Sequence, residues 1–148
     1  MDVIDIQNRL ATLEAEFNTL FNDTLPLFDL SGNTLKACLI NQLPMQVEWE
    51  MMVRKLSYLF DECEMEMETA YSASFKNEMS NKYVKVSTTE AKEFAKADPT
   101  YQSYRRALNK VRQVRDEARG CLETVMSRKY TCNSLTNAIV AGVDSTIL

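Results

Sequence analysis

Apolar residues recur along this chain at helical spacing. In residues 3–22 they stand three or four positions apart, which predicts an amphipathic first helix carrying Ile6, Leu10, Leu13, Phe17, Leu20 and Phe21 on one side. Leu25-Pro26-Leu27 and then Ser31-Gly32-Asn33 are expected to break it. A short helix from Asn33 or Thr34 to about Leu43 completes an N-terminal helical segment at 1–43.

A long helix is predicted next, in the segment 44–80, with Pro44 in its first turn. Its apolar positions alternate steps of four and three over about three heptads: Trp49, Val53, Leu56, Phe60, Cys63, Met67 and Ala70. A stripe of this length favours either an intramolecular hairpin or a helical oligomer. The candidate oligomer or partner interface therefore comprises Trp49, Val53, Leu56 and Phe60, with Tyr101 and Tyr104 from a later helix.

The pattern changes at residues 76–87, where Lys, Tyr and β-branched residues replace the helical stripe. We interpret 81–87 as a basic loop or short β-arm that follows the long helix. The interleaving of Lys76, Lys82, Tyr83 and Lys85 is typical of a segment that follows a single-stranded backbone while stacking a base. An ordinary solvated loop explains the same residues equally well.

The C-terminal half, 88–141, is predicted to be helical. Ser87-Thr88-Thr89-Glu90 forms a capping box that starts a helix over 88–96. Asp98-Pro99 gives a second start, with Asp98 as N-cap and Pro99 in the first helical position of a helix over 99–128. A short last helix is expected at 131–141, ended by Gly142.

These elements predict an all-α fold in a single domain, 1–148: an elongated helical hairpin or bundle with a long central helix and a short C-terminal helix. Three Gly and three Pro in 148 residues agree with that class, because all-β proteins need many turns. No apolar run approaches the roughly 18 residues of a membrane span, and the N-terminus is acidic where a signal peptide is basic. We expect a cytoplasmic protein of a bacterial host cell without a membrane partner.

The side-chain chemistry predicts a protein that is not an enzyme and has no cofactor. The chain contains no His, the commonest general base, and no phosphate-binding or metalloprotease motif. The four cysteines form no CxxC pair and are expected to be apolar fillers, so no metal site is predicted: Cys38, Cys63, Cys121 and Cys132.

Charge is divided along the chain. Residues 1–75 carry 13 acidic and 4 basic residues, a net charge of −9, whereas residues 76–129 carry 13 basic and 7 acidic residues, a net charge of +6. Arg105, Arg112 and Arg119 are spaced by seven and share a helix face, so they are candidate phosphate contacts. They could equally pair with the acidic long helix, within the chain or between subunits, and both charged faces could also be merely solvated.

The order of these motifs resembles the UvsY-like recombination mediator proteins of phages. The resemblance covers roughly residues 45–140. It rests on Thr89-Glu90-Ala91-Lys92 through Ala97-Asp98-Pro99-Thr100-Tyr101, the long helix that follows, and Ser127-Arg128-Lys129-Tyr130 before a terminal helix with Leu135 and Ile139. Tyr71-Ser72, before the arm, also has a counterpart in the family.

The resemblance implies a coiled-coil-rich phage protein of DNA recombination and repair. Such proteins bind single-stranded DNA as homo-oligomers, which can be rings, and help a RecA-like recombinase load onto strands covered by single-stranded DNA-binding protein. The family's DNA contacts correspond here to Lys76, Lys82 and Lys85, with Tyr83 beside them. The acidic run 61–68 departs from the family, in which this segment is more basic.

A different function would use the acidic residues instead. A helical adaptor or phage counter-defence inhibitor could present the carboxylates of 61–68 to a basic partner, with Glu62, Glu64, Glu66 and Glu68 in contact. The two hypotheses differ in which charged half of the chain meets the partner.

Overall fold

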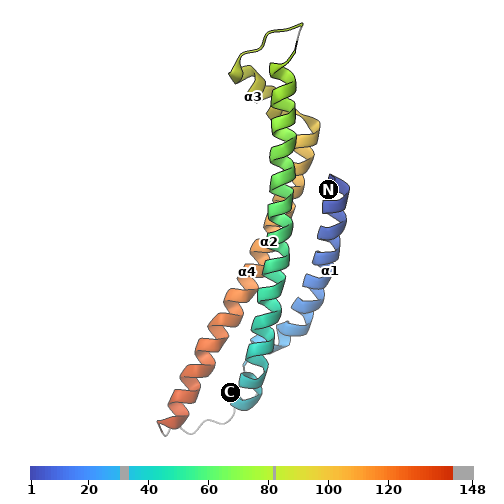
Figure 1. Cartoon of the computed structure of the whole chain (residues 1–148). Helices are drawn as coiled ribbons and strands as arrows, with labels where there is room; N and C mark the ends of the chain where they lie inside the picture. Colours follow the sequence, from blue (N-terminus) through green and yellow to red (C-terminus); the bar gives the residue numbers. More distant parts are fainter. Residues whose placement is uncertain (31–33, 82, 142–148) are drawn as a thin grey trace. The chain divides into compact units, whose positions relative to one another are not determined.

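The computed structural model describes residues 1–30, 34–81 and 83–141 and has an all-α fold. Its helices are α1 (Val3–Phe28), α2 (Leu35–Met79), α3 (Thr88–Ala97) and α4 (Pro99–Val140), in that order along the chain (Figure 1). No strand occurs in the described ranges, so the predicted arm is a loop and not a β-arm. The predicted break at Ser31-Gly32-Asn33 and the predicted stop at Gly142 lie outside these ranges.

The chain divides into two compact units. The first unit comprises Met1–Thr12 and Leu56–Val114, and the second comprises Leu13–Lys55 and Arg115–Leu148. Helices α1, α2 and α4 each contribute residues to both units, whereas α3 belongs to the first alone. The single domain expected from the sequence stays a prediction.

The core of the first unit joins α1, α2, α3 and α4. The Cys63 thiol of α2 donates to the Tyr104 carbonyl of α4 at 3.6 Å, and the Tyr104 hydroxyl donates to the Met1 carbonyl at 3.1 Å. These contacts link three segments far apart in sequence. The buried apolar side chains of this unit are Ile6, Leu10, Leu56, Leu59, Phe60, Cys63, Ala91, Ala95, Tyr104, Ala107, Leu108, Val111 and Val114.

The core of the second unit is built around Trp49. Its ring meets Phe17 of α1 edge-on at 5.5 Å, and its indole N–H donates to Thr24 Oγ1 at 3.3 Å. The Thr24 hydroxyl in turn donates to the Leu20 carbonyl at 2.8 Å, so the buried polar atoms here are paired. The other buried apolar side chains of this unit are Cys38, Met45, Met52, Ala118, Val125 and Cys132.

A buried arginine joins α4 to α2 in the second unit. Arg128 is only 5% exposed, and its Nη1 donates to the Cys38 carbonyl at 2.9 Å and to Gln42 Oε1 at 2.8 Å. The Gln42 amide donates back to the Val125 carbonyl at 2.9 Å. The charge is therefore satisfied by neutral oxygens, while Arg128 Nε has no hydrogen-bond partner in the described part of the chain.

Three predicted helix ends are wrong, because the helices continue through them. α1 includes Pro26, α2 includes Pro44, and α4 runs without interruption through 128–131 to Val140. Proline weakens a helix locally, but buried side chains on both sides of Pro44, Gln42 and Met45, hold α2 in register. No separate C-terminal helix exists, since the last predicted helix is the end of α4.

The predicted start signals of the last two helices, α3 and α4, are confirmed. Ser87 and Glu90 form both hydrogen bonds of a capping box at the start of α3. Asp98 Oδ2 accepts from the Tyr101 backbone N–H at 3.0 Å, and Pro99 is the first residue of α4. These local signals depend on residues within one turn, which is why the sequence shows them.

Candidate nucleic-acid interface

The predicted DNA contacts are distributed over several elements. Lys76 is exposed in the last turn of α2, and Tyr83 and Lys85 are exposed in the loop between α2 and α3. Arg105 and Arg112 lie on the part of α4 that belongs to the first unit. Lys82 lies outside the described residues.

The start of the loop is held by hydrogen bonds at the end of α2 and around Asn81. The Ser80 N–H donates to the Lys76 carbonyl at 3.0 Å, which extends the end of α2. The Asn81 side-chain oxygen then accepts from the backbone N–H groups of Tyr83 at 3.0 Å and Val84 at 3.4 Å, an Asx-type turn. Tyr83 projects from this turn and is 96% exposed, so both faces of its ring are open to solvent.

Lysines and arginines of α2, the loop, α3 and α4 all belong to the first unit. Residues 76–112 contain nine basic and four acidic residues, a net charge of +5. We call their described members the first-unit basic cluster: Lys76, Lys85, Lys92, Lys96, Arg105, Arg106, Lys110 and Arg112. Lys92 and Lys96 of α3 were not predicted as contacts, although their four-residue spacing on one helix could have indicated them.

Most of this basic cluster is not neutralised by the chain itself. Of its eight members, only Lys96 forms an ion pair within the described ranges, with Glu93 at 3.9 Å. Arg112 lies over the Phe60 ring at 5.5 Å and donates to Asn109 Oδ1 at 3.4 Å, which orients its guanidinium without cancelling its charge. The cluster can therefore meet external anions without first breaking an ion pair.

Two carboxylates of the acidic run of α2 form ion pairs with the N-terminal segment of the chain. Arg9 pairs with Glu62, and the N-terminal amine of Met1 lies 3.5 Å from Glu66. No ion pair in the described structure joins this run to the arginines of α4. The intramolecular pairing considered for Arg105 and Arg112 is thus not observed, and a pairing between subunits stays a prediction.

Arg119 does not join the other two arginines of the predicted stripe. It lies in the second unit, where its Nη1 is 3.7 Å from Asp116 Oδ1. The Nε of Arg115, which is largely covered, approaches the same carboxylate oxygen at 3.6 Å. Because the Asp116 carboxylate partly neutralises Arg119, less positive charge is available to a phosphate at this position. Arg119 is therefore the weakest of the predicted phosphate contacts.

The predicted partner interface is mostly interior. Trp49 and Leu56 are fully buried, Phe60 and Tyr104 are nearly so, and Val53 is half-buried. Tyr101 is also half-buried, and its ring lies 5.7 Å from that of Tyr71. The fully and nearly buried side chains have no surface left for a second chain, because α1 and α4 of the same chain already cover the heptad stripe.

An apolar pocket lies in the second unit. It has a volume of about 550 Å³ and is lined by Phe17, Asn18, Phe21, Phe28, Glu117, Gly120, Cys121 and Thr124. A Cβ built on Gly120 would meet no atom within 4 Å, so the helix leaves open space there. The described lining includes no Lys or Arg, and we therefore do not place a nucleic-acid contact in it.

The described ranges lack both a metal-binding group and a membrane-spanning helix. The described part of the chain holds no group of three or more His, Cys, Asp and Glu residues arranged to bind a metal ion. None of its helices combines the length and the apolar composition that crossing a membrane requires.

Comparison with known proteins adds no relative. The chain matches no protein-family model, no curated protein and no solved structure.

Proposed function

We propose that this protein is a non-enzymatic recombination mediator that binds single-stranded DNA and assists loading of a RecA-like recombinase. The observation that carries the proposal is the first-unit basic cluster, in which Lys96 alone forms an ion pair within the described ranges, on the same unit as the 96% exposed ring of Tyr83. In this proposal the protein acts in phage recombination and repair, in the cytoplasm of the host cell, with a single-stranded DNA-binding protein as its other partner.

The two parts of this surface match the two parts of a single strand. Lysine and arginine neutralise phosphates and release counterions, which gives affinity without sequence preference. An exposed aromatic ring stacks on an unpaired base, and such stacking is worth roughly 1–3 kcal/mol per base. A double-stranded helix presents no free base faces, so the combination favours a single strand.

The mediator step is supported by the resemblance to UvsY-like proteins. The motifs that carry it include Thr89 through Tyr101, where α3 ends and α4 begins. In that family a basic arm after the long helix contacts DNA, and Tyr83 and Lys85 occupy the corresponding loop here. The proposed role therefore combines the exposed basic residues of this chain with the activity of the family that its motifs resemble.

The adaptor alternative has less support. Two of its four proposed contacts are already paired, Glu62 with Arg9 of α1 and Glu66 with the Met1 amine before α1, so a basic partner would have to displace these groups. Glu64 and Glu68 form no ion pair in the described structure. They leave two unpaired carboxylates for a basic partner, whereas seven of the eight described members of the basic cluster are unpaired.

Binding of a fluorescent oligothymidine, followed by anisotropy over a salt series, tests the proposal. We expect binding that weakens steeply with salt. The variant Tyr83→Ala/Lys85→Ala/Arg105→Ala should bind at least tenfold more weakly, and its log–log salt slope should be shallower by about 1.4, since each lost phosphate contact removes about 0.7.

Arg119→Ala is the matched control, because it removes an arginine that is paired with Asp116 in the second unit. It should retain most of the affinity. No binding at low salt, or equal losses in the control and the triple variant, would contradict DNA binding through this surface. Faster recombinase loading on protein-coated strands tests the mediator step separately.

A further inference from the structure

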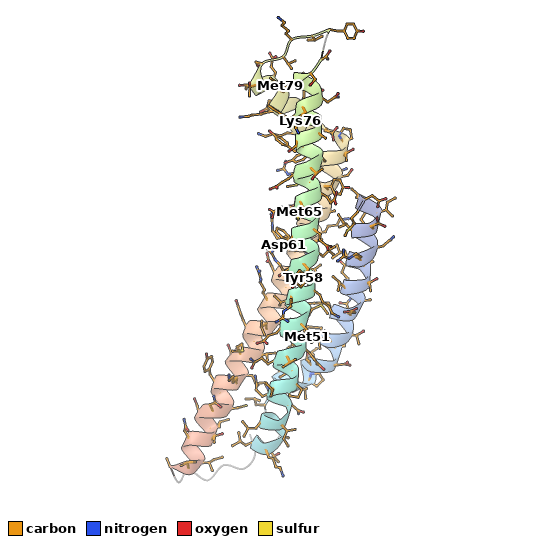
Figure 2. All side chains as sticks on the ribbon, viewed as in Figure 1. Met51, Tyr58, Asp61, Met65, Lys76 and Met79 are labelled. Atoms are coloured by element: carbon orange, nitrogen blue, oxygen red, sulfur yellow. The ribbon has the colours of Figure 1, made fainter. Side chains whose placement is uncertain are left out.

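One side of α2 in the first unit carries apolar side chains that no described helix covers. Tyr58 is 63% exposed, Met65 is 68% exposed and Met79 is 46% exposed. They are spaced by seven and fourteen residues, with Ser72 at the intermediate heptad position, so they follow one helix face. Figure 2 shows these three side chains in succession along α2, with Asp61 and Lys76 among them.

The same face contains both a protrusion and a depression. A shallow groove is lined by Met65, Glu68, Thr69, Ser72, Ala73 and Lys76. Thr69, Ser72 and Ala73 are small, so the groove floor lies one to two turns beyond the large side chain of Met65. A surface that bears a knob and a hole side by side can fit a copy of itself.

The charges on this face are complementary only when the faces of two copies pack antiparallel. Asp61 and Lys76 are both exposed and form no ion pair within the described ranges. They are fifteen residues apart, about 22 Å along the helix, so they cannot pair with each other in one chain. In a parallel pair of α2 helices each would face its own kind, and Glu68 would face Glu68, which is repulsive.

We propose that α2 packs antiparallel against α2 of a second copy, about a twofold axis between Glu68 and Thr69. This register places Asp61 opposite Lys76 of the other copy, twice by symmetry. It also places Tyr58 opposite Met79, and Met65 over Ser72 in the groove. Glu68 then faces Thr69 and no longer another carboxylate.

This contact is distinct from the buried heptad stripe, which lies on the opposite side of α2 and is covered within the chain. The proposal goes beyond DNA binding and does not depend on it. It assigns Lys76 to the contact between copies and leaves Tyr83, Lys85 and Arg105 to the nucleic acid.

Sedimentation equilibrium of the full chain over a range of concentrations tests the pairing. We expect a concentration-dependent assembly that Met65→Lys disrupts, because a charge enters the groove. Asp61→Lys should weaken it roughly tenfold, since two attractive contacts become repulsive. The exchange Asp61→Lys/Lys76→Asp should restore it. In a parallel pair position 61 would face position 61, so Asp61→Lys would replace one repulsion with another and would not weaken the assembly.

Lys92→Glu is the matched control, because it changes an exposed charge on α3 and should leave assembly unchanged. Circular dichroism confirms that each variant stays helical. A chain that remains monomeric up to about 0.5 mM overturns the proposal, and so does an assembly that resists Met65→Lys or is not rescued by the charge exchange. DNA binding by Met65→Lys, measured by anisotropy, keeps this outcome separate from that of the proposed function.

Discussion

At the scale of single residues, Cys63 illustrates how the interior changes a side chain. It is fully buried in the first unit, and its thiol donates to the Tyr104 carbonyl. Burial, with a smaller contribution from the Glu66 carboxylate, raises the pKa of Cys63 from 9.0 to about 11. The thiol therefore stays protonated and unreactive at neutral pH, in agreement with the expected role of an apolar filler.

This raised pKa predicts a loss of stability in alkaline solution. The unfolded thiol loses its proton near pH 9.0, whereas the folded thiol keeps it to about pH 11. The unfolded state thus binds fewer protons over this interval, and the free energy of unfolding falls as the pH rises, by roughly 3 kcal/mol in total from this group. Below pH 9 the contribution is fully present.

Urea unfolding of the wild type and of Cys63→Ala across pH 8–12 measures the effect. The variant should start less stable because of the small cavity, and the two stabilities should converge as the pH rises. Subtracting the two curves removes the contribution of other groups to a first approximation. Parallel curves would contradict the assignment to Cys63.

At the scale of elements, α2 contains a proline, Pro44, at an interior position where proline does not stabilise a helix. Pro44 has no N–H to donate to the Ile40 carbonyl, and its exposed ring contributes little packing. The helix nevertheless continues, because Gln42, Met45 and Trp49 are held by the second unit. Local sequence signals identified the weak point correctly but not its outcome.

Replacing this proline should stabilise the protein. Pro44→Ala restores a backbone donor and removes a steric clash, partly offset by a more flexible unfolded chain, for a net gain of about 1–2 kcal/mol. Thermal unfolding should shift upward by roughly 3–6 °C. Pro99→Ala is the control, since Pro99 occupies the first position of α4, where proline is favoured, and it should give no gain.

At the scale of the whole molecule, each unit is assembled from both sides of the loop between α2 and α3. The first unit joins Leu56 through Met79 to residues of α4, and the second joins Leu35 through Lys55 to the later part of α4. Contacts such as Cys63 with Tyr104 and Gln42 with Val125 join a residue before the loop to a residue after it. The two halves of the chain are therefore held by packing as well as by the backbone.

Cleavage in the loop should leave the protein associated. Tyr83, Val84 and Lys85 are exposed and outside any helix, so limited trypsin treatment should cut after Lys85 before it cuts the helices. The two fragments should elute together on gel filtration and separate only in denaturant. Separate elution under native conditions would show that the contacts across the loop do not hold the fold.

The sequence predicted those parts of the structure that depend on near neighbours. The capping box at Ser87 and the start at Asp98-Pro99 involve residues within one turn, and both are confirmed. The predicted ends at Pro26 and Pro44 and after Arg128 failed for the opposite reason. The helix-breaking tendency of these residues is offset by packing against segments that are distant in sequence. The clearest case is Arg128, whose side chain reaches Cys38 and Gln42.

The sequence by itself determined the all-α class, the apolar stripes, the starts of α3 and α4 and the basic character of 76–112, because each follows from periodicity or composition. Only the tertiary structure decided which faces meet. It showed that Trp49 and Leu56 are covered within the chain and that Glu62 and Glu66 pair with Arg9 and the Met1 amine. It also showed that Arg105 pairs with no acid among the described residues. Partners of charges and apolar faces depend on contacts across dozens of residues, and no local pattern encodes them.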